Sequence, residues 1–161
     1  METKRIALYP GSFDPFTLGH KVIVEQSLRL FDEIVIAIGE NSNKRPFLSI
    51  EKRIKLIEQC FPCCDNVKVI SYKGLTAEYC RKNDINFIVR GVRNTVDFEF
   101  ERSIAGVNKK LNPNIENVFL MTPVEFSEIS STVVREIVLN GGDPSEFMPK
   151  EISLKDLKNN E

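Results

Sequence analysis

Short apolar runs alternate along the chain with longer stretches in which apolar residues recur at helical spacing. The runs are rich in valine, isoleucine, leucine and phenylalanine, and the second, Ile34 to Ile38, is apolar without interruption. Such a run is typical of a strand covered on both faces of a sheet. The pattern predicts five β-strands, at 6–9, 34–38, 67–70, 87–89 and 118–121.

The stretches between the runs have apolar residues three or four positions apart, which predicts amphipathic helices. Ser49 is the expected N-cap of one helix, with Glu51 in its first turn, where a carboxylate complements the helix dipole. Gly141 and Gly142 are expected to stop the last helix of the series. Apolar residues recur at this spacing over 24–31, 50–61, 75–82, 96–111 and 134–138.

Five strands separated by helices are typical of right-handed βαβ units. We therefore expect an α/β fold, with a single Rossmann-like domain over residues 1–161 built on a five-stranded parallel sheet with helices on both faces. The tail at about 149–161 is expected to be a C-terminal helix or an irregular end, and Ile152, Leu154 and Leu157 favour a short helix. Ligands of such sheets bind beyond the carboxyl ends of the strands, so the search for a site starts there.

Composition and charge narrow the classes of partner. Hydrophobic residues make up 42% of the chain, enough for a core, and 22 basic against 23 acidic side chains leave a net charge of −1. A nucleic-acid or membrane-surface binder would show a basic excess. No stretch approaches the roughly 18 apolar residues of a membrane span, and the N-terminus lacks a signal-peptide pattern. We expect a cytoplasmic protein with no nucleic-acid or membrane partner.

The chain has four cysteines and one histidine, His20. Cys60 and Cys63 have the spacing of a metal or redox pair, but no second pair or histidine cluster completes a zinc site. Together with Cys64 and Cys80, they are interpreted as buried or incidental thiols of a reducing compartment. The single histidine excludes metal sites with several histidines and acid–base mechanisms with two.

The segment from Pro10 to His20 follows the first strand and holds two prolines and two glycines, which predicts a rigid loop with special backbone angles. Gly11 and Ser12 permit close approach to a ligand and present a hydroxyl. Gly19 and His20 then open a helix, whose unpaired N–H groups attract an anion. The alternative is a capping loop with a hydrogen-bonded histidine. Because the two glycine-containing pairs flank one helix mouth, we favour a phosphate site.

Cations follow the second and fourth strands. Lys44 lies in the polar loop after the second strand, where a point charge can reach a phosphate. Arg90 and Arg93 stand beside a glycine directly beyond the fourth strand, an arrangement that suits an oligophosphate. The alternative for the arginines is pairing with a nearby carboxylate, at Asp97, Glu99 or Glu101.

Ser130, Ser131 and Thr132 open the last predicted helix of the series with three consecutive hydroxyls, more than one N-cap needs. With the free N–H groups of that helix they form a second candidate anion site. The chain has neither the phosphate-binding loop of P-loop proteins nor the glycine fingerprint of dinucleotide-binding folds. Phosphate recognition must therefore use these other loops.

Two motifs resemble the paired signatures of the nucleotidyltransferase superfamily: Thr17-x-Gly19-His20 and Ile129-Ser130-Ser131-Thr132-x-x-Arg135. Further stretches resemble the bacterial phosphopantetheine adenylyltransferases: Tyr9 to Pro15, Lys44 to Pro46, Ile88 to Arg93, Asp97 to Glu101 and Phe119 to Met121. The resemblance implies transfer of the adenylyl group of ATP to 4′-phosphopantetheine, yielding dephospho-coenzyme A and pyrophosphate in coenzyme A biosynthesis. It also implies Mg²⁺, a cytoplasmic location and a homohexamer.

The resemblance assigns roles to the matching positions. It implies catalytic roles for His20 at the α-phosphate and for Lys44 at the acceptor phosphate. The residues that it implies for ATP binding are Ser12, Phe13, His20, Gly91, Val92, Arg93, Glu101, Phe126, Ser127, Glu128, Ile129, Ser130, Ser131 and Thr132. Those that it implies for the acceptor are Ser12, Lys44, Thr76 and Arg90. Phe100 and Phe126 stand where many relatives have tyrosine and tryptophan.

An acceptor phosphate is a nucleophile at neutral pH, so the expected reaction needs no general base. It needs in-line positioning and stabilisation of a crowded α-phosphate. No carboxylate cluster in the sequence offers a metal cage, so Mg²⁺ is expected on phosphates and water. Two alternatives stay open. One is another adenylyl- or cytidylyltransferase of the superfamily, and the other is a nucleotide-sensing domain, which would not need His20.

Overall fold

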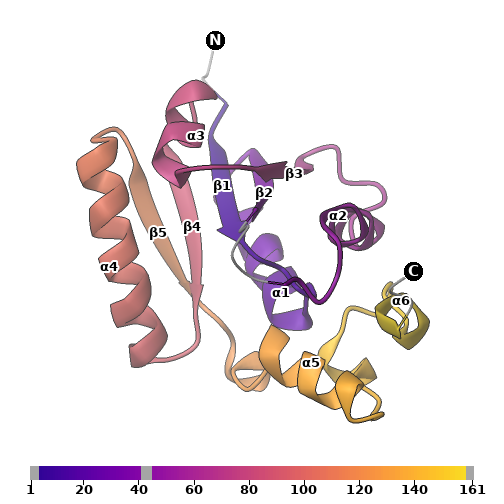
Figure 1. Ribbon diagram of the computed structural model, residues 1–161. Helices are drawn as coiled ribbons and strands as arrows, with labels where there is room; N and C mark the ends of the chain where they lie inside the picture. Colours follow the sequence, from indigo (N-terminus) through magenta and orange to yellow (C-terminus); the bar gives the residue numbers. More distant parts are fainter. Residues whose placement is uncertain (1–3, 41–44, 159–161) are drawn as a thin grey trace.

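The computed structural model describes residues 4–40 and 45–158 of the chain (Figure 1). The strands are β1 (Ile6–Gly11), β2 (Glu33–Gly39), β3 (Val67–Tyr72), β4 (Phe87–Val92) and β5 (Glu116–Met121). The α-helices are α1 (Leu18–Ser27), α2 (Ile50–Gln59), α3 (Thr76–Lys82), α4 (Thr95–Leu111), α5 (Ser131–Leu139) and α6 (Leu154–Lys158). The short 3₁₀ helices η1 (Val124–Phe126) and η2 (Ser145–Phe147) flank α5.

All five strands are parallel and lie in the order β3-β2-β1-β4-β5. The predicted α/β fold with a five-stranded parallel sheet is confirmed. The chain runs from β1 to the edge strand β3 and then crosses back to place β4 on the other side of β1 (Figure 1). The strand order therefore reverses between β1 and β4, where ligands of open parallel sheets bind.

Alternate side chains of the central strands fill two separate cores, one on each face of the sheet. On one face, Ile36 of β2 belongs to the core formed with α1, α2, α5 and the C-terminal segment. On the other face, Val35 packs with Ala77 of α3, and α4 lies beside α3. The apolar run of β2 is thus buried on both faces, as its sequence predicts.

α1 begins where the sequence predicts a helix to open: it starts at Leu18, directly after its N-cap Thr17. It ends at Ser27, although apolar residues at helical spacing continue to Phe31. Phe31 is buried but lies in the turn that leads to β2. The apolar periodicity continues past the helix because residues of this turn pack into the same core.

The expected caps of two other helices are present. The Oγ of Ser49 accepts the backbone N–H of Lys52 at 3.2 Å, and Glu51 lies in the first turn of α2. α5 ends at Leu139, and Gly141 follows with a φ of 79°, a left-handed conformation that glycine adopts without strain. Local side-chain and backbone preferences therefore set these two helix ends.

The C-terminal tail belongs to the core around α1 and α2. Of the two expected forms, a helix or an irregular end, the tail has a short helix, α6, and Leu157 of this helix is 1% exposed. Ile152, which precedes α6, is buried as well. Nearby, Nζ of Lys21 in α1 donates to the carboxylate of Glu151 at 2.8 Å. The tail therefore packs against the helix that follows the first strand.

The four cysteines are free thiols. Cys60 and Cys80 are buried, and burial raises the pKa of Cys60 to about 12 and that of Cys80 to about 11. Both side chains therefore stay protonated and unreactive at neutral pH. Cys63 is exposed and Cys64 is half-buried. Burial is therefore confirmed for Cys60 and Cys80, and the interpretation of Cys63 and Cys64 as incidental thiols stays a prediction.

The helices within 4–40 and 45–158 are all too short or too polar to cross a lipid bilayer.

The loop after β1 joins two other segments to the sheet. The carboxylate of Asp14 accepts the backbone N–H groups of residues 47 and 48, each at 2.8 Å, and so holds the chain just before α2. The backbone carbonyl of Asp14 accepts Nη1 of Arg135 in α5 at 2.8 Å. Arg53 of α2 donates to the carbonyl of Ser12 at 2.7 Å. α2 and α5 are therefore both tied to the same short loop.

Asp14→Ala would leave two half-buried backbone N–H groups without their acceptor. We expect the free energy of unfolding to fall by roughly 2 to 4 kcal/mol, measured by urea denaturation. Asp14→Asn keeps one oxygen acceptor, so its loss should be smaller. Two variants as stable as the parent protein would show that these hydrogen bonds do not anchor the loop.

Candidate active site

β1 and β4 pair over a short distance and then separate. Their paired residues are Ala7 with Phe87 and Leu8 with Ile88. By contrast, β1 pairs with β2, and β4 with β5, along six consecutive residues. A crevice therefore opens between the carboxyl ends of β1 and β4, at the point where the strand order reverses.

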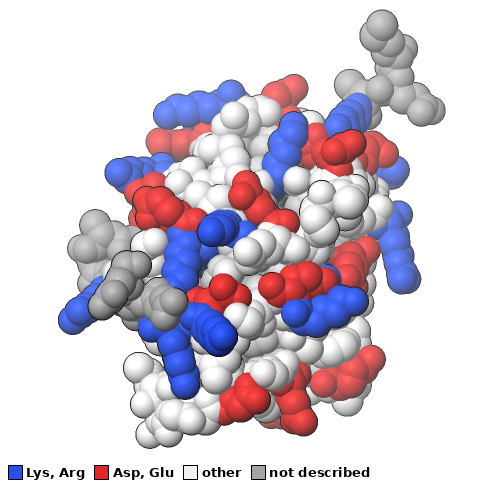
Figure 2. All heavy atoms as spheres, turned by 90° about the vertical axis from the view of Figure 1, so that its right-hand side faces the viewer, with Lys and Arg blue, Asp and Glu red and all other residues white. Residues whose placement is uncertain are grey.

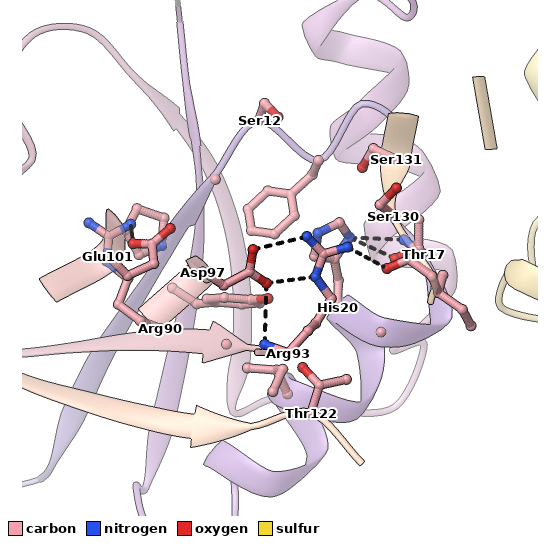
Figure 3. A pocket seen from close by; sticks show the side chains of 18 of the residues that line it. Ser12, Thr17, His20, Arg90, Arg93, Asp97, Glu101, Thr122, Ser130 and Ser131 are labelled. Atoms are coloured by element: carbon pink, nitrogen blue, oxygen red, sulfur yellow. Dashed lines mark hydrogen bonds and ion pairs between the residues drawn. The ribbon is translucent and has the colours of Figure 1, made fainter. Parts of the chain in front are cut away.

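A pocket of about 350 Å³ occupies this crevice, a volume that suits a small ligand (Figure 3). It is lined from the loop after β1, the end of β4, the first turns of α1 and α4, and the segment between β5 and α5. The lining residues are Tyr9, Pro10, Gly11, Ser12, Phe13, Thr17, Gly19, His20, Ile23, Arg90, Gly91, Arg93, Asp97, Phe100, Glu101, Thr122, Ile129, Ser130 and Ser131.

His20 lies in the first turn of α1 and lines the pocket. Its Nδ1 accepts the backbone N–H of Thr17 at 3.0 Å and lies 3.1 Å from Oγ1 of Thr17 (Figure 3). The ring thereby caps the helix that Thr17 begins. The sequence left open whether His20 caps the helix or lines a ligand site. The structure shows both, because Nδ1 caps the helix while the ring borders the pocket.

Aromatic rings surround the imidazole. The ring centroids of Phe13 and Phe16 lie 5.1 and 5.5 Å from that of His20, and the ring of Tyr9 lies at 6.5 Å. This burial, with the positive charge of Arg93 nearby, lowers the pKa of His20 to about 4. His20 is therefore an uncharged imidazole at neutral pH.

The loop that holds Phe13 has the unusual backbone that its glycines and prolines predict. Phe13 has a φ of 47°, a left-handed conformation that residues with a side chain adopt rarely. Its ring is 2% exposed and lies against Gly11, where an added Cβ would come within 2.8 Å of the ring. A glycine at position 11 is therefore required for the ring to reach His20.

Arg93 follows β4 directly and forms an ion pair with Asp97 in the first turn of α4. Nε and Nη2 of Arg93 donate to the two carboxylate oxygens at 2.7 and 3.2 Å, and Nη1 donates to the carbonyl of Ile129 at 3.4 Å. These bonds hold the pKa of Asp97 below its usual value. The guanidinium is thus fixed between α4 and the segment before α5, next to His20 (Figure 3).

Arg90, within β4, is 9% exposed and reaches Glu101 of α4, with 3.1 Å between Nη1 and Oε2. This ion pair lacks hydrogen-bond alignment, and the buried Nε of Arg90 and Oε2 of Glu101 have no hydrogen-bond partner within residues 4–40 and 45–158. A buried donor of this kind is rare in folded proteins and calls for an explanation. An anionic ligand in the pocket would supply its acceptor.

The three hydroxyl groups at the start of α5 all form hydrogen bonds within the protein. Oγ of Ser130 accepts the N–H of Val133 as the N-cap, and Oγ of Ser131 donates to the carbonyl of Pro15 at 2.8 Å. Oγ1 of Thr132 accepts Nη2 of Arg135 at 3.0 Å. Ser130 and Ser131 line the pocket, while these bonds dock α5 on the loop after β1.

The acidic groups of the pocket do not form a metal site. Asp97 and Glu101 are each engaged by an arginine. In the described ranges, no three histidine, cysteine, aspartate or glutamate side chains come together in a way that could hold a metal ion. The residues present therefore do not fit a resident Mg²⁺ ion.

Most of the predicted site residues meet at the pocket: Ser12, Phe13, His20, Arg90, Gly91, Arg93, Glu101, Ile129, Ser130 and Ser131 line it. Lys44 lies outside the described residues. Thr76 is at the start of α3, where its Oγ1 lies 2.8 Å from the hydroxyl of Tyr72, and Val92 is buried in the sheet. Phe126, Ser127, Glu128 and Thr132 flank the lining residues of the segment before α5 but are not among them.

The lining also contains residues to which the sequence assigns no site role. Tyr9 and Ile23 belong to the apolar patterns of β1 and α1, so nothing distinguishes them from core residues. Thr122 directly follows β5, a position at the carboxyl edge of the sheet. The contact between Thr17 and His20 could have been predicted from the sequence. The spacing of the two residues is that of a capping box, with histidine in place of glutamate or glutamine.

Charged side chains outside the pocket are mixed in sign. On the face that carries α2 and α6, Lys and Arg side chains are interspersed with Asp and Glu side chains (Figure 2). This face is not the uniformly basic surface that a polyanion binder presents.

Comparison with known proteins identifies relatives. A family model described as cytidylyltransferase-like matches residues 8–137. A phosphopantetheine adenylyltransferase of Flavobacterium psychrophilum is 48% identical over 151 residues, which are 94% of this chain and 99% of that protein. A phosphopantetheine adenylyltransferase of Cytophaga hutchinsonii is 48% identical over 148 residues, which are 92% of this chain and 99% of that protein.

A solved structure shows the same fold. It is a bifunctional NMN adenylyltransferase/ADP ribose pyrophosphatase of Francisella tularensis, with a TM-score of 0.70 at 19% identity over 93% of this chain and 46% of that chain.

The family model spans the sheet from β1 to α5 and includes every element that lines the pocket. The chain therefore belongs to the cytidylyltransferase-like family, and within it to the phosphopantetheine adenylyltransferases.

Proposed function

We propose that this chain transfers the adenylyl group of ATP to 4′-phosphopantetheine, which yields dephospho-coenzyme A and pyrophosphate. The observation that carries the proposal is the convergence of His20, Arg90 and Arg93 on one pocket at the mouth of α1. The names of relatives that are 48% identical over nearly the whole chain support this choice of acceptor. A cytoplasmic location, expected from the sequence, belongs to the same proposal.

The reaction is a displacement at the α-phosphorus of ATP. An oxygen of the acceptor phosphate forms a bond to this phosphorus, and the bond to the oxygen that bridges the α- and β-phosphates breaks. The nucleophile is already ionised, so the site needs no base. It has to align the two substrates and to stabilise the negative charge around the α-phosphate. A hydrogen bond from His20 and the free N–H groups at the start of α1 suit the second task.

The two arginines suit different phosphates. Arg93 lies between α4 and Ile129, close to the start of α5, and would hold the β- and γ-phosphates. Arg90 has a buried Nε without a partner in the described ranges, and would donate it to the acceptor phosphate. Lys44, predicted to act at the acceptor phosphate, keeps that role as a proposal.

Mg²⁺ belongs to the proposal as part of the substrate. Because the carboxylates of the pocket are paired with arginines, the ion would arrive on the triphosphate of ATP, held by phosphate oxygens and water. The chain would contribute arginines that share the phosphate charge with it.

A homohexamer is proposed from the resemblance and from an apolar stripe on α4. Val96, Phe100, Val107 and Leu111 recur along one side of this helix and are 42 to 77% exposed. A stripe of large apolar side chains left in water marks a protein interface. We propose that further copies of this chain cover it.

An acceptor panel tests the proposed reaction. ATP and Mg²⁺ are incubated with 4′-phosphopantetheine, nicotinamide mononucleotide, glycerol phosphate or pantetheine without phosphate, and pyrophosphate release is measured. We expect release with 4′-phosphopantetheine alone. The arginines require an anionic acceptor, which excludes pantetheine, and the names of the relatives favour 4′-phosphopantetheine over the other two phosphates. Release with a different phosphorylated acceptor would identify another transferase of the superfamily. No release with any acceptor, while ATP still binds, would favour a nucleotide sensor.

His20→Ala removes a hydrogen-bond donor at the α-phosphate. We expect kcat to fall by about 100- to 1,000-fold, with a smaller change in the affinity for ATP because the arginines remain. Steady-state kinetics measure the first quantity and calorimetric titration the second. A thermal melt serves as the control, since the variant also loses a helix-capping contact. Near-normal turnover in a folded variant would refute the role of His20.

Val107→Glu places a charge in the middle of the apolar stripe of α4. We expect the hexamer to dissociate into smaller species, measured by light scattering coupled to size-exclusion chromatography. Leu139→Glu is the matched control, because Leu139 is a 74% exposed apolar residue of α5 and lies outside the stripe. An unchanged mass for Val107→Glu, or equal dissociation of both variants, would contradict the proposed interface.

A further inference from the structure

We propose that Thr17 is a positioning residue that holds His20 as a neutral imidazole with its hydrogen on Nε2, so that His20 meets the substrate as an uncharged hydrogen-bond donor. The structural part of this inference stands on the contacts of the two residues. Its catalytic part rests on the proposed function.

The direction of one hydrogen bond assigns the tautomer. The backbone N–H of Thr17 points to Nδ1 of His20 at 3.0 Å. A backbone N–H can only donate, so Nδ1 must offer a lone pair. A neutral imidazole has one donor and one acceptor nitrogen, and its hydrogen therefore lies on Nε2. A ring with hydrogens on both nitrogens would set two donors against each other at Nδ1.

The surroundings of Thr17 protect this bond. Thr17 is 1% exposed, and its Oγ1 lies 3.1 Å from Nδ1, where the hydroxyl is placed to donate as a second partner. The burial of Thr17 keeps water away from its side of both contacts. The helix cap and the tautomer of His20 are consequently one structural feature.

The groups that face His20 from other elements favour the uncharged ring. Phe13 and Phe16, from the loop after β1, and Tyr9 of β1 present aromatic rings. Arg93, beyond β4, brings a positive charge, which disfavours a second cation beside it, and Asp97 of α4 directs its carboxylate to Arg93. Burial and the charge of Arg93 accordingly lower the pKa of His20 to about 4.

This arrangement has a chemical consequence. Within the described ranges, hydrogen bonds to the ring of His20 reach Nδ1, and the ring lines the pocket. An Nε2–H group that is already neutral gives no proton to the leaving pyrophosphate. It stabilises charge on the α-phosphate by a hydrogen bond. The strength of this bond stays the same across the pH range in which a histidine usually changes its charge.

The single histidine of the chain makes the tautomer measurable without assignment. The protein is labelled with ¹⁵N in its histidine ring, and the nitrogen shifts and one-bond couplings to hydrogen are recorded from about pH 5 to about pH 8. We expect a hydrogen on Nε2, none on Nδ1, and no titration over this range. A hydrogen on Nδ1, or a titration near the ordinary pKa of about 6.5, would overturn the inference whether or not the protein is an adenylyltransferase.

Two matched variants test the catalytic part. Glutamine and glutamate are both favoured at this position of a capping box, so His20→Gln and His20→Glu should each keep the contact with Thr17. His20→Gln also keeps a neutral N–H donor toward the pocket, whereas His20→Glu has none. We expect His20→Gln to retain a kcat at least about tenfold above that of His20→Glu and of His20→Ala. Equal losses in the three folded variants would contradict a neutral donor.

Thr17→Val tests the positioning role. It removes Oγ1 and keeps the backbone N–H, so the hydrogen should stay on Nε2, with kcat reduced by less than about tenfold. Thr17→Pro removes the N–H itself, and we expect the ring to lose its single tautomer in the nitrogen spectrum. A folded Thr17→Pro variant, shown by a cooperative thermal melt, whose ring still carries its hydrogen on Nε2 alone would overturn the role of Thr17. Absence of activity with every acceptor in the parent protein would refute the proposed function and leave these spectra decisive.

Discussion

The site depends on a constraint that the connectivity of the sheet imposes on β1 and β4. These neighbouring strands lead to helices on opposite faces, since α1 packs with α2 while α4 lies beside α3. The strands must therefore part after Leu8 and Ile88. The resulting crevice brings the mouth of α1 and the first turns of α4 together. Gly91 completes the arrangement, because a Cβ there would lie 2.8 Å from Ile23 of α1.

Much of this architecture could be predicted because its signals are local. The uninterrupted run from Ile34 to Ile38 indicates a strand buried on both faces, and it is one. Alternation of strands and helices is enough to infer a parallel sheet and to direct attention to its carboxyl edge. Arg93 directly follows β4, and His20 lies in the first turn of the helix that follows β1. Arg90 was expected beyond the fourth strand but lies within it, near its carboxyl end, because β4 extends to Val92. The meeting of these three residues in one pocket follows from that geometry.

The remainder could not be predicted because it depends on contacts between distant segments. The order of the strands decides which loops meet, and no local pattern encodes it. Pairing of Arg93 with Asp97 and of Arg90 with Glu101 was one of two open alternatives, and the structure shows that pairing and pocket lining coexist. Tyr9 reads as a core residue, yet it borders the pocket. Burial, with the nearby charge of Glu101, raises its pKa, so its phenol stays neutral there.

The balance of charge in the pocket explains how a chain with a net charge of −1 can recognise oligophosphates. The two arginines are matched by two carboxylates, and the imidazole beside Arg93 is uncharged, so the pocket has no large excess of positive charge. A phosphate must therefore compete with Asp97 or Glu101 for a guanidinium, or share it. A single anion gains little from such an exchange. Under the proposed function, the phosphates of ATP at Arg93 and the start of α1 and the acceptor phosphate at Arg90 are held together, so selection depends on how the charges of the two substrates are spaced.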